Sequence, residues 1–363
     1  MSTRPARPSG LLRCVLAGPL LWPVLLFQAM MIHAADAMPV TDRPLNLVIA
    51  HRGASGHLPE HTLAAKALAV GLGAGAIEQD VVLSRDGVPI VFHDPYLDAT
   101  TDVASRFPGR ARTDGRHYVM DFDLAELRTL QLRERVDPAS GQPRFAGRYS
   151  GTAASFGVAT LDEELAFARS LERTLGRTVA VYPEIKHPAE HRAAGLDATR
   201  AVLAVLERHG YRTRRDPAYL QCFDATELRR IRHELRSELT LIQLIGDPRD
   251  GDAGAEYARM LTPEGLAGIA GYADGIGPWL EQIVRWPEPG AAPVFSTLVA
   301  DAHARGLLVH PYTLRRDSLP ANAPDLEAVH EALFIKAGVD GAFSDFPELT
   351  LEFLQRRPPG KAR

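Results

Sequence analysis

Eight short apolar segments rich in β-forming residues alternate with eight amphipathic stretches along this chain of 363 residues. The segments are apolar at nearly every position, which is typical of parallel strands that are buried on both faces. This alternation predicts an α/β protein whose strands close into a (β/α)₈ TIM barrel. The expected strands are residues 46–51, 76–83, 179–185, 219–223, 240–245, 274–278, 307–312 and 341–344, and the expected helices lie near 61–72, 161–175, 192–209, 225–236, 263–271, 295–305, 325–337 and 347–356.

An open, doubly wound sheet is the alternative architecture. Such a sheet normally carries a glycine-rich nucleotide loop after its first strand, and no G-x-G-x-x-G pattern follows residues 46–51. Hydrophobic residues make up 45% of the chain and charged residues 24%, which is enough apolar material for one large core. The net charge is −4 and nothing in the sequence suggests the clustered basic face of a nucleic-acid surface, so we expect no nucleic-acid partner.

Residues 81–92 interrupt the alternation with the pattern of a β-hairpin, and Asp86-Gly87 is its expected turn. If these two residues form the loop, strand pairing brings Asp80 opposite His93 and returns the end of the hairpin to the barrel mouth. Residues 90–93 are therefore not counted as a barrel strand. Residues 95–158 lack a clear period, and a connection of this length is usually functional or disordered. We expect a small inserted capping subdomain there, after the second strand.

The N-terminus has the succession of a secretory signal peptide. Arginines precede an uncharged, mostly apolar run at 14–32, and Ala35-Asp36-Ala37 offers small residues for cleavage. Residues 1–37 would then be removed, leaving 38–363 in the periplasm. An uncleaved anchor is the alternative, because the run approaches the ~20 residues that span a bilayer. Cleavage would leave Cys222 as the only cysteine and no segment for stable membrane insertion.

Four motifs with chemically active residues lie at expected strand ends or at the end of the hairpin. Functional residues of α/β barrels lie at the carboxyl ends of the strands. The motifs are His51-Arg52-Gly53, Glu78-Gln79-Asp80, His93-Asp94 and Glu184-Ile185-Lys186. Each motif alone is unspecific, but together they predict a site that hydrolyses a phosphate ester with a divalent cation.

Glu78, Asp80 and Glu184 are the candidate metal ligands. A set of oxygen donors without cysteine selects Ca²⁺ or Mg²⁺ over zinc, and Ca²⁺ is favoured outside the cytoplasm, with Mg²⁺ as the alternative. Two carboxylates at positions i and i+2 point to the same side of a strand. Taken singly, Glu78 and Asp80 would be read as strand-end carboxylates paired with Arg52, whereas the convergence of all three favours a metal.

His51 and His93 are the candidate proton carriers, since a phosphodiester needs a base for the attacking oxygen and an acid for the departing alcohol. Arg52 and Lys186 are candidate phosphate contacts. A lone strand-end histidine is more often a packed residue, but these two lie near the expected carboxylates. Phe223 and Trp279 are candidates for the alcohol side of the pocket, and core packing is an equally good explanation of them.

Nine segments of the chain resemble the glycerophosphodiester phosphodiesterases. They are residues 49–56, 59–62, 78–80, 91–94, 160–163, 182–186, 220–224, 310–313 and 345–347. The resemblance spans about 47–355 and is closest to the periplasmic, calcium-dependent bacterial branch, which the chain also resembles at 101–104 and 106–108.

The resemblance implies a (β/α)₈ barrel that cleaves deacylated phospholipids, such as glycerophosphocholine or glycerophosphoethanolamine, into sn-glycerol 3-phosphate and an alcohol. By the family pattern, the metal carboxylates fall on Glu78, Asp80 and Glu184. The acid/base histidines fall on His51 and His93, and the phosphate contacts fall on Arg52 and Lys186.

Three other functions remain open at this point. A phosphodiesterase that cleaves lysophospholipids or sphingolipids could use the same barrel, but such relatives usually lack an insertion like 95–158. A catalytically idle binding protein would show a degenerate site, and none of the seven key residues is missing. A cofactor enzyme is disfavoured because no cofactor motif is present. The expected partners are small-molecule glycerophosphodiesters, and a homodimer is left open.

Overall fold

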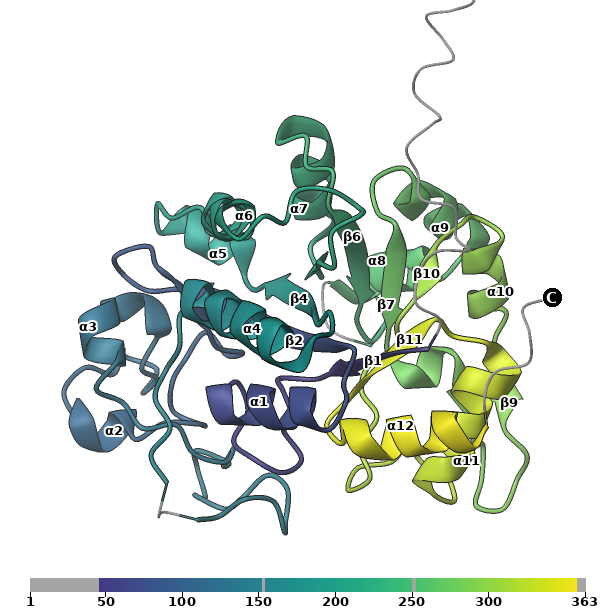
Figure 1. Cartoon of the computed structure of the whole chain (residues 1–363), viewed down its shortest axis with the longest axis horizontal. Helices are drawn as coiled ribbons and strands as arrows, with labels where there is room; N and C mark the ends of the chain where they lie inside the picture. Colours follow the sequence, from purple (N-terminus) through teal and green to yellow (C-terminus); the bar gives the residue numbers. More distant parts are fainter. Residues whose placement is uncertain (1–45, 152–153, 250–252, 358–363) are drawn as a thin grey trace, which may run out of the picture. The chain divides into compact units, whose positions relative to one another are not determined.

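The computed structural model describes residues 46–151, 154–249 and 253–357. Eight strands form a parallel sheet in the order β10-β7-β6-β5-β4-β2-β1-β11, which curls into a barrel surrounded by helices (Figure 1). The strands are β1 Leu47–Ala50, β2 Ala76–Leu83, β4 Ala180–Ile185, β5 Tyr219–Cys222, β6 Thr240–Ile245, β7 Gly275–Pro278, β10 Leu308–Val309 and β11 Gly341–Ser344. The predicted (β/α)₈ fold is confirmed. The expected signal segment lies outside the described residues.

The seam between β10 and β11 is joined by single backbone hydrogen bonds rather than by a continuous ladder. Asp340 N donates to Val309 O (3.1 Å), and Phe343 N donates to Pro311 O (3.0 Å). Beyond β10, Leu314 N donates to Phe343 O, and Asp345 N donates to Leu314 O. The barrel is therefore nearly closed, and the residues that follow β10 and β11 are held next to each other at its mouth.

The helices that cover the outside of the barrel mostly follow the predicted amphipathic stretches. They are α1 Leu63–Gly71, α4 Leu161–Leu175, α5 Pro188–Ala193, α6 Ala198–Arg208, α7 Ala225–Arg229, α8 Gly254–Met260, α9 Pro263–Ala270, α10 Leu298–His303, α11 Leu326–His330 and α12 Pro347–Arg356. Helix α4 matches its predicted bounds because Thr160 and Glu163 form a capping box at its start and Gly176 ends it in the left-handed conformation. Helices α7 and α11 continue as π-helical turns, Arg230–Glu234 and Glu331–Ala337.

Two stretches differ from the predicted helices. The single helix expected at 192–209 is split, because Gly195 adopts a positive φ of 81° and the Asp197 side chain caps a new start by accepting from Arg200 N. The helix expected from residue 295 begins later, since 294–295 pair with 284–285 as the short ribbon of β8 (Val284–Arg285) and β9 (Val294–Phe295). Helix α8 was not predicted.

The side chains that point into the barrel form a small core of their own. They include Tyr182, Tyr219 and Phe343, and the rings of Tyr182 and Tyr219 stack with their centroids 4.9 Å apart. Strand side chains alternate between the two faces of a sheet. Residues two positions further along the same strands, such as Glu184 after Tyr182, therefore also point inward. This floor of aromatic rings supports the site at the mouth.

The hairpin forms, but its predicted loop was wrong. Strand β3 (Pro89–Val91) pairs with β2 in the register Val81↔Val91 and Leu83↔Pro89, and its Ile90 also forms a bridge with Thr160. The loop has three residues and ends in Gly87, whose φ of +76° is typical of a three-residue hairpin with a glycine bulge. Consequently Phe92 N donates to Asp80 O (2.8 Å), and Phe92, not His93, lies opposite Asp80.

Residues 95–158 pack on this hairpin. The segment contains α2 Val103–Arg106, a 3₁₀ turn Val119–Asp121 that contacts β2, and α3 Leu124–Leu127. Helices α2 and α3 lie at one side of the barrel (Figure 1). Its buried apolar side chains form a separate cluster with hairpin residues Val82, Ile90 and Phe92. The hairpin therefore links the barrel to the insertion.

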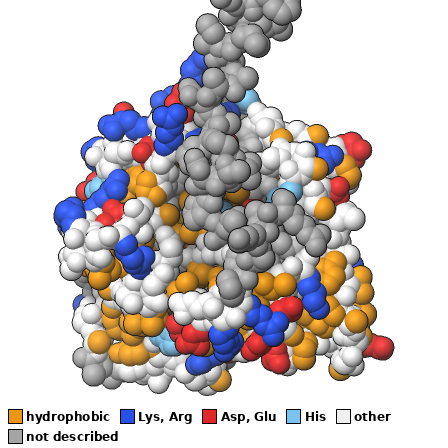
Figure 2. All heavy atoms as spheres, turned by 45° about the vertical axis from the view of Figure 1, so that its right-hand side comes forward, with side chains coloured by type: hydrophobic (Ala, Val, Ile, Leu, Met, Phe, Trp, Pro, Cys, Tyr) orange, Lys and Arg blue, Asp and Glu red, His pale blue; other side chains and the backbone are white. Residues whose placement is uncertain are grey.

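Acidic and basic side chains are interspersed with apolar ones on the face seen in Figure 2. Within residues 46–151, 154–249 and 253–357, no helix has both the length and the apolar character that crossing a bilayer requires.

Candidate active site

A cavity of about 300 Å³ opens at the carboxyl ends of the strands. All nine site residues predicted from the sequence line it, although they come from β1, β2, β4, β5, β7 and the end of the hairpin. They are His51, Arg52, Glu78, Asp80, His93, Glu184, Lys186, Phe223 and Trp279. Leu244, Tyr312 and Phe343 also line the cavity, which therefore combines charged side chains with aromatic and aliphatic ones.

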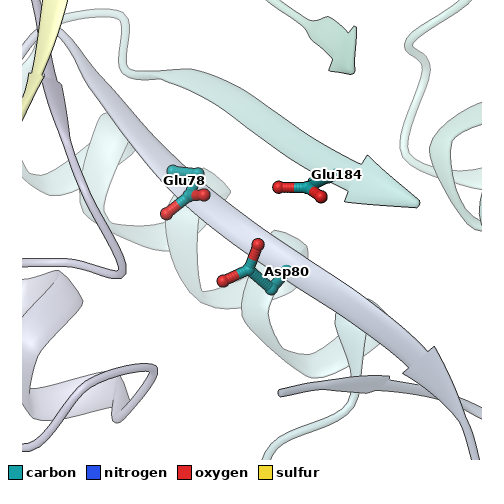
Figure 3. A group of neighbouring side chains, drawn as sticks. All are labelled: Glu78, Asp80 and Glu184. Carbon is teal, nitrogen blue, oxygen red and sulfur yellow. The ribbon is translucent and has the colours of Figure 1, made fainter. Parts of the chain in front are cut away.

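The three predicted metal ligands form a compact acidic group. Asp80 of β2 is paired in register with Glu184 of β4, and Glu78 lies two residues earlier on β2. One carboxylate oxygen from each lies within 4.8 Å of the others, and all three side chains are buried. Figure 3 shows the carboxylates gathered over the two neighbouring strands. The buried Oδ1 of Asp80 accepts no hydrogen bond from the described residues. This donor set fits a hard divalent cation.

Without a bound cation, burial and mutual repulsion oppose the ionisation of all three carboxylates together. Burial, followed by the charge of Asp80, raises the pKa of Glu78 well above its usual range. Burial is also the main reason that the pKa of Glu184 is raised to about 8, and the charge of Asp80 adds to it. Burial opposes ionisation of Asp80 as well, but Lys186 and His93 hold its pKa well below normal. A bound cation would favour the ionised form of all three.

Arg52 lies in a tight turn directly after β1, with a positive φ of 59°. Its backbone N donates to Glu78 Oε2 (2.6 Å). Its guanidinium contacts Glu60 Oε1 at 3.0 Å and Asp80 Oδ2 at 3.3 Å. The salt bridge that the sequence suggested with Glu78 is thus made with Glu60 and Asp80, and the link to Glu78 runs through the backbone.

Lys186 reaches the acidic group from the other side. Its Nζ lies 2.9 Å from Glu184 Oε1 and 3.5 Å from Asp80 Oδ1. The same ammonium lies 5.9 Å from the centre of the Phe223 ring. Burial opposes its charge, but Asp80 and Glu184 outweigh burial and raise its pKa, so Lys186 is a permanent cation in the cavity.

His51 is oriented by a carboxylate from the barrel seam. Its Nδ1 lies 2.6 Å from Asp345 Oδ1, and a carboxylate accepts hydrogen bonds, so Nδ1 carries the proton and Nε2 is left as the basic nitrogen. Arg148 of the insertion and Arg315 both donate to the other oxygen, Asp345 Oδ2, at 2.7 and 2.8 Å. Burial and then the charge of Arg52 lower the pKa of His51 to about 4.

His93 is held by an equivalent chain of contacts. Its Nδ1 lies 2.5 Å from Asp94 Oδ1, and Arg135 Nη1 donates to Asp94 Oδ2 (2.6 Å). Arg135 also forks onto Glu60 through Nε and Nη2, at 3.1 and 2.7 Å. Burial, followed by the charge of Arg52, lowers the pKa of His93 to about 3. Each histidine therefore has a carboxylate partner, and the insertion supplies an arginine to each carboxylate.

Several residues that support the site were not among the predicted site residues. His61 is buried, and its Nε2 lies 2.8 Å from Asp80 Oδ2. Behind β2, the fully buried Lys66 donates to Glu78 O and lies 2.8 Å from Glu164 Oε1. Gln221 lines the cavity with a buried Oε1 that accepts no hydrogen bond from the described residues. His61 and Gln221 fall in motifs that carried the family resemblance, whereas Lys66 looked like an ordinary helix residue.

The comparison with known sequences is unambiguous. The family model described as the glycerophosphoryl diester phosphodiesterase family matches residues 51–349. A glycerophosphodiester phosphodiesterase of Haemophilus influenzae is 39% identical over 340 residues, which cover 89% of this chain and 93% of the relative. A glycerophosphodiester phosphodiesterase of Treponema pallidum is 37% identical over 326 residues, which cover 85% and 91%.

Solved structures agree with the sequence comparison. A provisionally named glycerophosphoryl diester phosphodiesterase of Silicibacter pomeroyi superposes with a TM-score of 0.65 at 26% identity, over 88% of this chain and 96% of that one. An Oleispira antarctica phosphodiesterase, whose structure contains the product sn-glycerol-3-phosphate, shares the fold with a TM-score of 0.55 at 21% identity, over 86% and 97%.

Proposed function

This chain belongs to the glycerophosphoryl diester phosphodiesterase family and is an enzyme of that kind, and we propose that it hydrolyses deacylated phospholipids in a reaction that depends on Ca²⁺. The substrates are glycerophosphodiesters such as glycerophosphocholine and glycerophosphoethanolamine, and the products are sn-glycerol 3-phosphate and the alcohol. The observation that carries the proposal is the meeting of two carboxylate-bound histidines and three buried carboxylates in one cavity.

Glu78, Asp80 and Glu184 would hold the cation, and Ca²⁺ rather than Mg²⁺ is proposed because it accepts an irregular set of oxygen ligands. When bound, the cation supplies positive charge that polarises the phosphoryl oxygens. Arg52 and Lys186 contribute two further fixed cations from the protein. Arg52 forms ion pairs with Glu60 and Asp80, and Lys186 forms ion pairs with Glu184 and Asp80. Neither cation therefore has to reorganise as negative charge develops on the phosphate.

The two histidines divide the proton transfers. We assign His51 as the base, which acts through the Nε2 that is unprotonated when Nδ1 donates to Asp345, and His93 at the end of the hairpin as the acid. It takes the proton from water, or from the 2-hydroxyl of the substrate if the reaction passes through a cyclic phosphate. His93 then gives a proton to the alcohol oxygen as the P–O bond breaks. An anionic phosphodiester beside His93 raises its pKa from the low value of the empty cavity, which allows it to act as an acid.

Leaving groups of different acidity test this division. His93→Ala should lower kcat ~10²–10⁴-fold on glycerophosphocholine, whose alcohol departs poorly without a proton. The loss should be much smaller on an activated aryl ester. His51→Ala should lower kcat equally on both substrates. If each variant loses the same factor in kcat on the alkyl and the aryl substrate, the assignment is wrong. If either variant keeps a near-normal rate on alkyl substrates, that histidine is only structural.

Metal dependence is tested by chelation. We expect chelator-treated enzyme to lose turnover and Ca²⁺ to restore it better than Zn²⁺, since three hard oxygen donors suit Ca²⁺. Glu190, an exposed carboxylate outside the group, provides the control: Glu190→Gln should bind and respond to Ca²⁺ like the wild type, whereas Asp80→Asn should not. Full activity of metal-free enzyme would remove the metal role from the three carboxylates.

We further propose that the protein is exported and that residues 1–37 are removed. The support is the order of arginines, apolar run and small residues at the N-terminus. Sequencing the N-terminus of protein from a periplasmic extract tests this, and we expect a start near Ala37 to Pro39. An intact Met1 on most of the protein would contradict it.

A further inference from the structure

A second cavity of about 230 Å³ adjoins the catalytic one on the side of the insertion. His51, Arg52, His93 and Arg315 line both cavities. The wall that belongs to the second cavity alone is built largely by the insertion, with Arg135, Arg144, Phe145 and Arg148. A group attached to the leaving oxygen beside His93 could therefore extend into this space. This placement differs from the one suggested by the sequence, because Phe223 and Trp279, the candidates for the alcohol side, line only the first of these two cavities.

Two of the insertion arginines are already neutralised. Arg135 is forked onto Glu60 and also bound to Asp94, as described above. Arg148 donates to Asp317 through Nε and Nη2 (2.8 and 2.9 Å) and to Asp345. These two guanidiniums are structural: they hold carboxylates that in turn position the histidines, and they have little charge left for a ligand.

Arg144 of the insertion and Arg315, which follows β10, keep free donors. Arg315 uses its Nε on Asp345 Oδ2, and its two Nη groups make no hydrogen bond with the described residues. The guanidinium of Arg144 makes no hydrogen bond or ion pair within the described ranges, and it acts on the exposed Asp137 only through its charge. Its backbone is fixed, because Arg144 N donates to Arg135 O (2.9 Å). Phe145, next in sequence, lies 5.8 Å from Arg315 and 3.7 Å from Arg148.

We propose that this second cavity is a subsite for a second phosphate of the substrate, so that glycerophosphodiesters whose alcohol carries another phosphodiester are bound there by Arg144 and Arg315. A guanidinium can fork two donors onto two phosphate oxygens. This proposal rests on the proposed function, because it assumes that the alcohol departs on the side of His93. It predicts a preference that depends on the charge of the alcohol and not on its size alone.

Two matched substrates test the subsite. Glycerophosphoglycerol and bis(glycerophospho)glycerol share the reacting diester, and only the second carries an additional phosphate on its alcohol. For the wild type we expect a higher kcat/KM on the second substrate, with the advantage falling at high salt because the contact is ionic. Arg144→Ala should reduce the ratio of the two kcat/KM values ~3- to 10-fold, mainly through KM. Arg144→Lys should lose less, since it keeps the charge but not the fork.

Arg133 provides the control, because it is an exposed arginine of the insertion outside both cavities. Arg133→Ala should keep the wild-type ratio, and melting curves should show all variants folded. An unchanged ratio in Arg144→Ala, with normal hydrolysis of glycerophosphoglycerol, would overturn the subsite and leave the proposed function standing. A wild type that hydrolyses neither substrate nor glycerophosphocholine would overturn the proposed function, and the subsite with it.

Discussion

Glu184→Gln should make the metal-free protein more stable while it destroys the metal site. Glu184 is buried next to Asp80, and its pKa is raised to about 8, mainly by burial. The folded protein therefore keeps this carboxyl protonated at neutral pH, whereas the unfolded chain ionises it near its ordinary value of 4.5. Glutamine has nearly the same shape and carries no charge, so it escapes this penalty.

The size of the effect follows from the difference between the two pKa values. At pH 7, keeping a carboxyl protonated that would ionise near 4.5 costs about 3 kcal/mol of folding free energy. With an unfolding entropy of about 2.1 cal/mol/K per residue, a domain of this length should gain roughly 4 to 5 °C in Tm. Ca²⁺ at about 1,000 times its Kd should reverse the order, because it then stabilises the wild type by about 4.1 kcal/mol.

The pH dependence has a defined sign. A carboxyl whose folded pKa is raised loses stability as pH rises from about 4.5 to about 8, because the unfolded chain binds fewer protons in this range. Buried His51 and His61, with pKa values lowered to about 4, act in the opposite sense below about 6.5. The clear window is therefore pH 6.5 to 8, where both histidines are neutral in the folded protein and lose most of their remaining charge in the unfolded chain. In this window the Tm of the chelated wild type should fall relative to that of the variant.

The assay is a set of thermal melts between pH 6.5 and 8, with chelator and with Ca²⁺. Glu352→Gln, a change at an exposed glutamate of α12, controls for the loss of one surface charge and should match the wild type throughout. If chelated Glu184→Gln melts at or below the wild-type temperature, and the difference does not grow with pH, the argument that the carboxylates repel each other in the empty site is wrong.

Three further outcomes are expected. Asp345→Asn and Asp94→Asn should each lower kcat by about tenfold or more with little change in KM, because each carboxylate fixes the proton on Nδ1 of a catalytic histidine; steady-state kinetics showing normal kcat would exclude that role. Gly87→Ala should destabilise the protein by about 1 kcal/mol in urea unfolding, since its φ is positive and its neighbours leave room for a methyl group; no loss would argue against the three-residue loop. Lys66→Met should cost about 3 to 5 kcal/mol by leaving Glu164 buried without a partner, and Lys66→Met/Glu164→Met should recover most of it; equal losses would mean that the pair is not coupled.

The barrel and the charged residues of its cavity were predictable because the apolar pattern of each strand indicates that the strand is buried. Strand β2 is apolar except at positions 78–80, and polar residues in the middle of a buried strand need a compensating partner or ligand. The alternation of side chains then places Glu78 and Asp80 on the inner face. The eight strands follow from such local patterns, and the nine predicted residues of the cavity lie on these strands, just after their ends or at the end of the hairpin.

The supporting network was not predictable in the same way. Arg135 and Arg148 lie in a segment without periodicity, and nothing near them in sequence marks Asp94 or Asp345 as their partners. The predicted hairpin register was wrong by one residue, because Asp86-Gly87 suits a two-residue turn. The sequence does not reveal that the Ser84 hydroxyl accepts from Val88 N and donates to Asp86, which closes a loop of three residues. The break before α6 depends similarly on local capping at Asp197, which competes with a continuous amphipathic pattern.

The insertion helps to position both proposed catalytic histidines. Arg148 donates to Asp345, which orients His51 on the barrel, and Arg135 donates to Asp94, which orients His93 at the end of the hairpin. A change in the insertion that displaces Arg135 and Arg148 would therefore disturb the carboxylates that orient both imidazoles. In directed evolution, we expect backbone changes in the insertion to lower activity often, and side-chain changes there to alter the preference for the leaving group. The segment is best exchanged between relatives as one block, together with the hairpin on which it packs.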